Sequence, residues 1–156
     1  MKEKLWLFIV KFILVSAPLA LLWYWKAGAW YLVFLNHVYS NLFVKVLGFD
    51  IKFFAPPADV FYGLIAFVSL MIITRGIDLR TRLRQVLLGI LITVLWHLVL
   101  TEAVYLLHED QGVPSAAYDK LSPVLYIFTG TLPFVLWVLF APKQVAGLFL
   151  RPKKKD

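Results

Sequence analysis

The sequence predicts an all-α membrane protein with four transmembrane helices, both chain ends in the cytoplasm and one further amphipathic helix in the outer interface. The first observation is composition: 62% of the 156 residues are hydrophobic and mean hydropathy is +0.81, whereas soluble domains are about half apolar. The second is length, since roughly 20 apolar residues cross a hydrocarbon core of roughly 30 Å. Four stretches fit this requirement and fill one integral membrane domain, 1–156: 5–25, 58–74, 86–107 and 123–141.

The distribution of Lys and Arg predicts the orientation of these spans. Basic residues gather before the first span, between the second and third, and after the fourth, while the other two connections contain few. The positive-inside rule then places both termini in the cytoplasm of a bacterial-type inner membrane. We expect these side chains to set topology and to meet lipid headgroups, with 142–156 as a solvated basic tail. They include Arg75, Arg80, Arg82, Arg84, Lys153, Lys154 and Lys155.

A formal net charge of +7 could suggest a nucleic-acid partner, but the charges cluster at span ends, so the bilayer is the expected partner. The chain has no cysteine, which excludes disulfides, thiolate metal sites and a cysteine nucleophile. Its three histidines are too scattered for a metal-site signature. We therefore expect neither a metal nor another cofactor.

The connection 27–57 contains an apolar stretch interrupted by polar residues. Within 30–47, His37, Asn41 and Lys45 recur every fourth residue and would share one face of a helix, and Trp30 suits headgroup depth. This pattern favours an amphipathic helix lying in the outer interface. A shallow re-entrant segment is the alternative.

The third predicted span carries a polar stripe. Thr93, His97, Thr101 and Tyr105 fall every fourth residue and should face the bundle or a partner, because lipid would leave their donors unpaired. His97 has two interpretations. It could transfer a proton, or it could be a structural histidine bonded to a hydroxyl or carbonyl of a neighbouring helix.

Other titratable residues complete the candidate site. Glu102 is a functional candidate because carboxylates within membrane spans are rare and costly; its structural alternative is pairing with Lys52, Lys26 or Lys120. If the site is catalytic, Asp59 and His108 would join His97 and Glu102 in lining a cavity.

The region 57–107 resembles the core of the exosortase/archaeosortase superfamily of membrane transpeptidases. The likeness consists of the opening Phe61-Tyr62-Gly63-Leu64, an Arg-rich turn at 75–84 and a long apolar span with a polar interruption. The resemblance implies a Cys before the Gly-Leu pair and an Arg in the following span. Here Phe61 occupies the Cys position and 86–107 contains no Arg, so acyl transfer by the family mechanism cannot run.

The whole chain also resembles the small, non-catalytic membrane proteins that accompany some exosortases, through the segment 18–25, the long connection after it and the close with Leu132-Pro133-Phe134. We therefore expect a non-enzymatic accessory or assembly subunit that binds another membrane protein in a protein-sorting or envelope system. The alternative is a peptidase-like enzyme or a small carrier, facing the outer leaflet, that uses His97 and Glu102.

Overall fold

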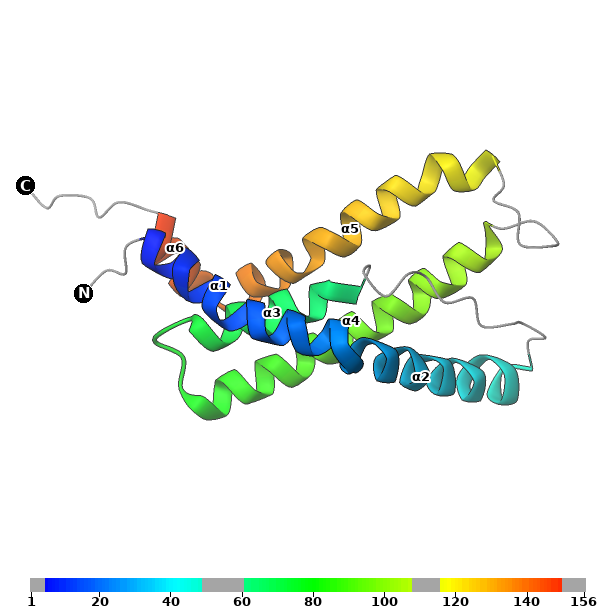
Figure 1. Cartoon of the computed structure of the whole chain (residues 1–156), viewed down its shortest axis with the longest axis horizontal. Coiled ribbons are helices and arrows are strands. Elements are labelled where there is room, and N and C mark those ends of the chain that lie inside the picture. Colours follow the sequence, from blue (N-terminus) through cyan, green and yellow to red (C-terminus); the bar gives the residue numbers. More distant parts are fainter. Residues whose placement is uncertain (1–4, 49–60, 108–115, 150–156) are drawn as a thin grey trace, which may run out of the picture.

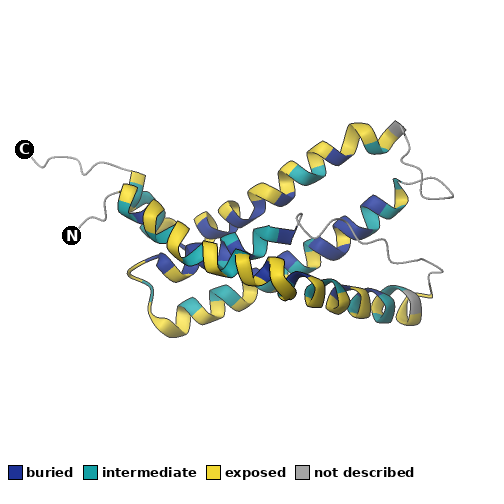
Figure 2. Ribbon diagram, viewed as in Figure 1, coloured by how far each residue is buried: buried dark blue, intermediate teal, exposed yellow. Residues whose placement is uncertain are grey.

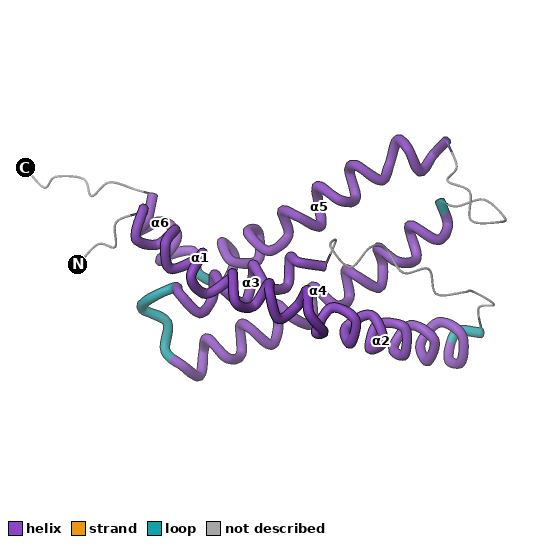
Figure 3. The backbone as a smooth tube through the Cα atoms, viewed as in Figure 1, coloured by secondary structure: helices purple, strands orange, loops and turns teal. Residues whose placement is uncertain are grey.

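The computed structural model describes residues 5–48, 61–107 and 116–149, and nearly all of them are helical (Figures 1 and 3). The described part of the chain contains no strand. The elements in order are α1 (Leu5–Leu22), η1 (Trp23–Ala27), α2 (Gly28–Tyr39), η2 (Ser40–Val46), α3 (Gly63–Ile73), α4 (Leu79–Leu106), α5 (Ala116–Phe140) and α6 (Pro142–Phe149). Helices α1 and α6 begin and end the described chain at one end of the molecule, here called the near end; α2 and the start of α5 mark the far end (Figure 1).

The protein is a multi-pass membrane protein by the length and apolar character of its helices. Within the described residues, three helices are long and apolar enough to cross a bilayer: Leu5–Phe43, Leu79–Leu106 and Ala117–Phe140. The predicted second span, 58–74, corresponds in its described part to α3, which has 11 residues and extends only roughly 16 Å. The prediction of an all-α membrane fold is confirmed.

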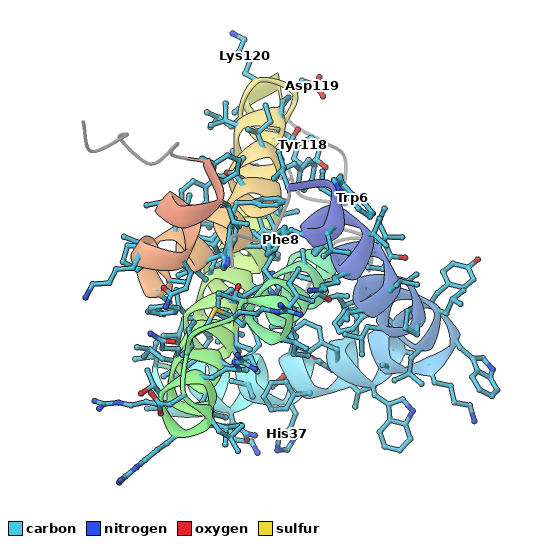
Figure 4. All side chains as sticks on the ribbon, turned by 90° about the vertical axis from the view of Figure 1, so that its left-hand side faces the viewer. Trp6, Phe8, His37, Tyr118, Asp119 and Lys120 are labelled. Atoms are coloured by element: carbon cyan, nitrogen blue, oxygen red, sulfur yellow. The ribbon has the colours of Figure 1, made fainter. Side chains whose placement is uncertain are left out.

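The first helix does not end near residue 25, so the predicted break between a first span and a separate interfacial helix is wrong. Elements α1, η1, α2 and η2 follow one another without an intervening loop, and Leu5–Phe43 alone covers 39 residues, or roughly 58 Å. The joint η1 is a π-helical turn, a recognised cause of helix bending, and α1 and α2 run in different directions on either side of it (Figures 1 and 4).

The predicted arginine turn, 75–84, is mostly helix. Asp78 caps α4, its carboxylate accepting a hydrogen bond of 2.9 Å from the Thr81 backbone N–H. Helix α4 therefore begins at Leu79, and three of the four arginines lie in its first two turns rather than in a loop. Gly76, with φ of +79°, makes the turn itself.

The last predicted span and the tail also start differently. Helix α5 begins at Ala116, so Pro123 lies inside it rather than opening it. The segment after it is not simply a solvated tail, because Pro142–Phe149 forms α6. Pro142 suits the first position of a helix, and the apolar side of α6 packs on the bundle through Val145 and Leu148.

Among the described residues, two groups of buried hydrophobic residues hold the helices together; Figure 2 colours buried positions dark blue. The near-end group joins α1, α3 and α5 around Phe67, Met71 and Trp137. The far-end group joins η1, α2, α3 and α4 around Trp23, Phe61 and Leu98.

Candidate functional site

The polar stripe of α4 faces the interior of the bundle. Thr93, His97 and Thr101 are buried and Tyr105 is half-buried, as the spacing predicts. The two threonine hydroxyls donate within α4, Thr93 to the Gly89 carbonyl and Thr101 to the His97 carbonyl, both at 2.8 Å. These three residues therefore serve the bundle and cannot contact a partner directly.

His97 is enclosed between helices. Its side chain is 1% exposed, and its Nδ1 atom lies 2.6 Å from the hydroxyl oxygen of Tyr31 on α2. The Phe61 ring packs against the imidazole with 4.5 Å between centroids. This arrangement matches the structural interpretation, a histidine bonded to a hydroxyl of a neighbouring helix. Phe61 fills the space beside His97.

Glu102 is held by a second tyrosine of the same neighbouring helix. The Tyr39 hydroxyl donates to Glu102 Oε2 in a short hydrogen bond. Neither Lys26 nor Lys120 pairs with this carboxylate, and Figure 4 shows Lys120 projecting from the start of α5; Lys52 lies outside the described residues. Among the described residues, the side chain that bonds to Glu102 is therefore the neutral Tyr39 and not a lysine.

Tyr31 and Tyr39 belong to this site, although the polar pattern of α4 does not predict them. Tyr31, Leu35 and Tyr39 are spaced four residues apart, so they share one face of α2. Leu35 and Tyr39 are fully buried. This periodicity was a readable signal, but Tyr31 also fitted the aromatic belt expected at headgroup depth. We call Tyr31, His97, Tyr39 and Glu102 the tyrosine seam.

The other predicted site residues do not join the seam. Trp30, His37 and Lys45 are exposed on α2 and η2, and Asn41 is half-buried; Figure 4 shows His37 at the edge of the molecule. Because η2 is π-helical, spacing of four residues no longer repeats one face there. Asp59, His108, Lys153, Lys154 and Lys155 lie outside the described residues.

The arginines divide into two groups. Arg75, Arg80 and Arg84 are exposed, which suits the predicted role at the headgroups. Arg82 instead donates from its guanidinium to the Thr74 carbonyl at 2.7 Å and, more weakly, to the Ile77 carbonyl at 3.4 Å. It therefore holds the turn between α3 and α4.

Further polar bonds close the near end around this turn. The Trp137 indole donates to the Thr74 hydroxyl at 2.9 Å, and Gln85 donates to the Phe140 carbonyl at 2.8 Å. Gln144 on α6 reaches the Gly76 carbonyl at 3.3 Å. Together these bonds join α3, α4, α5 and α6, and the Gln85 bond satisfies a partly buried backbone carbonyl that would otherwise be costly to leave unpaired.

Two hollows are lined by described residues alone. One of about 270 Å³ lies between α1 and α3, around Ser16, Ala20 and Tyr62. Another of about 300 Å³ lies between α4 and α5, around Ala103 and Leu125. Neither of these two hollows is lined by His97 or Glu102. No three His, Asp or Glu side chains of the described segments gather to hold a metal.

Comparisons with known proteins found no match to this chain among protein families, curated proteins or solved structures.

Proposed function

We propose that this protein is a non-enzymatic accessory or assembly subunit of a larger membrane complex. The observation that carries the proposal is the uncovered state of its first helix. Only 6% of the most apolar 18 residues of Leu5–Phe43 are buried, against 33% for α4 and 28% for α5. The polar contacts between this first helix and α4 involve one face of α2. Trp30 and Val33, on the other face of α2, are at least 70% exposed.

The burial and hydrogen bonding of His97 support a structural role for this residue. A catalytic histidine must reach the proton that it transfers, directly or through one water. His97 is instead packed against Phe61 and bonded to Tyr31. The enzyme or carrier alternative would require Phe61 to move away before any substrate reached the imidazole.

The proposal includes four crossings with both ends in the cytoplasm of a bacterial-type inner membrane. Support comes from the position of α1 and α6 at the same end of the molecule (Figure 1), since an odd number of crossings would separate them. The α3–α4 turn and the start of α4, which carry the exposed Arg75, Arg80 and Arg84, lie at that end too (Figure 1), in keeping with the positive-inside rule. The proposed second crossing is the predicted span 58–74, of which α3 forms part.

The test is purification of the tagged protein from its native membrane in a gentle detergent, followed by mass spectrometry. We expect a membrane protein to co-elute in fixed stoichiometry, and the resemblance makes an exosortase-type protein the first partner to look for. The variant Trp30→Ala/Val33→Ala should reduce this co-elution, whereas Val138→Ala/Leu139→Ala on the exposed face of α5 should not. Recovery of the folded, monodisperse protein alone would contradict the proposal.

A further inference from the structure

One face of α4 remains uncovered along most of the helix. The residues Leu88, Leu91, Leu95, Val99 and Leu106 are between 45% and 69% exposed. Their spacing of three, four, four and seven residues keeps them on one side of an α-helix. The buried residues of α4, including His97, Leu100 and Val104, lie on the opposite side. We call the exposed set the α4 stripe.

Glu102 lies within the α4 stripe. It follows Val99 by three residues and precedes Leu106 by four, so its Cα occupies the same face of the helix. Its side chain is partly exposed, and the Tyr39 bond occupies only Oε2. Oε1 is not among the buried unpaired atoms of the described residues. A carboxylate oxygen is therefore accessible beside an apolar helix face.

An accessible carboxylate beside lipid is costly unless a cation or further donors compensate for it. Tyr39 supplies one neutral donor, and the described residues supply no cation within ion-pair distance. An apolar face with a 3-4 spacing is also the geometry by which one helix packs against another. The charge and the shape of this surface point to the same kind of partner.

We propose that the α4 stripe docks a transmembrane helix of the partner protein, and that this helix carries a lysine or arginine that pairs with Glu102. The apolar residues supply the packing, and the ion pair fixes the depth and the rotation of the partner helix. A second copy of this chain does not fit the surface, because a symmetric contact would bring two Glu102 carboxylates together. This inference rests on the proposed function and names the chemistry of the partner.

The experiment uses the full-length protein in vesicles with synthetic transmembrane peptides of roughly 21 residues. The peptides are identical leucine-alanine helices that carry Lys, Gln or Leu one helical turn from one end. Association is measured by Förster transfer between a labelled peptide and the labelled protein. We expect the Lys peptide to associate at about tenfold lower concentration than the Gln peptide, since hydrogen bonds between charged groups are stronger than neutral ones.

Two variants separate charge from packing. Glu102→Gln keeps a carbonyl oxygen for Tyr39 but removes the charge, so the Lys and Gln peptides should become equivalent. Val99→Trp should weaken association of all three peptides by crowding the stripe, whereas Leu139→Trp, at an exposed position of α5, should leave it unchanged. Equal binding of the Lys and Leu peptides to the wild type would show that no ion pair with Glu102 contributes to association, and this result would overturn the inference.

The outcome remains distinguishable from that of the proposed function. If the Lys peptide is preferred but no native partner co-elutes, the docking surface stands and the subunit proposal fails. If a native partner co-elutes equally well with wild type and Glu102→Gln, the subunit proposal stands, and this stripe is not its point of contact.

Discussion

The near and far ends of this molecule are held together in different ways. At the near end, Arg82, Trp137 and Gln144 each donate to a neighbouring segment, so that four helices are joined around one turn. At the far end, the tyrosine seam joins α2 to α4, while α5 lies well apart from α2 (Figure 1). The Trp96–Thr129 bond of 2.9 Å ties α5 to α4 closer to the middle.

This difference teaches where the molecule is stable and where it is adaptable. A region with few buried contacts opens at lower free-energy cost than a packed core. We therefore expect the near end to act as the rigid base and α2 to be the element that moves when a partner binds.

The largest effect should come from Gly89, where α3 and α4 cross between the two ends. A Cβ atom at this position would lie 2.1 Å from the Phe67 ring, and Phe67 is fully buried. Gly89→Ala should therefore destabilise the protein by about 1–3 kcal/mol through overpacking, measured by unfolding in mixed micelles. The matched control is Gly130→Ala, because a Cβ atom there meets nothing within 4 Å. Equal stability of the two variants would mean that the helices cross elsewhere.

The next effect should come from breaking the tyrosine seam. Tyr31→Phe/Tyr39→Phe removes both hydroxyls that tie α2 to α4, while keeping the rings. Since the chain has no cysteine, single cysteines at Lys45 and Lys120 can carry spin labels. The distribution of distances between them should broaden in the double variant and remain unchanged in Tyr24→Phe, whose side chain is 82% exposed. A narrow distribution in all three proteins would show that packing alone fixes α2.

A smaller effect is expected from the near-end bond between Trp137 and Thr74. Interhelical hydrogen bonds in membranes contribute about 0.6 kcal/mol on average. A double-mutant cycle with Trp137→Phe and Thr74→Val should give a coupling energy of this order. Because other bonds hold the same helices, neither single variant should unfold the near end. A coupling energy near zero would show that the Trp137–Thr74 bond does not stabilise the near end.

The smallest effect concerns the cap of α4. Hydrogen bonds from Thr81, the backbone N–H first, hold the pKa of Asp78 below its ordinary value. The cap therefore stabilises the folded state above the unfolded-state pKa of Asp78, and this contribution is lost as pH falls through the lower folded-state pKa. Asp78→Asn, which keeps an acceptor, should show less loss of thermal stability on acidification. An identical pH profile for both proteins would contradict this role.

Much of the fold follows from the sequence because bilayer constraints are strong. Apolar length indicates the spans, and the four-residue spacing of Thr93, His97 and Thr101 indicates the buried side of α4. The structural alternative for His97 is likewise a direct consequence of the cost of leaving its donors in lipid.

The hydrogen-bond partners on neighbouring helices were harder to predict, because one amino-acid sequence does not show which helices pack together. The structural alternative for Glu102 is a lysine partner, yet Tyr39 donates to its carboxylate. The predicted end of the first helix was wrong for a local reason. Neither Trp25 nor Gly28 ends the first helix, because residues on both sides remain apolar and η1 absorbs the change of direction through a wider turn.

The absence of a loop between α1 and α2 makes the chain sensitive to its own length. Each residue turns an α-helix by about 100°. Deleting or inserting one residue in α1 would therefore rotate α2 relative to α1, and Tyr31 and Tyr39 would no longer point at α4. Homologues of this protein should vary freely in side chain along α1 while keeping its residue count, because that count sets the angular phase of the seam.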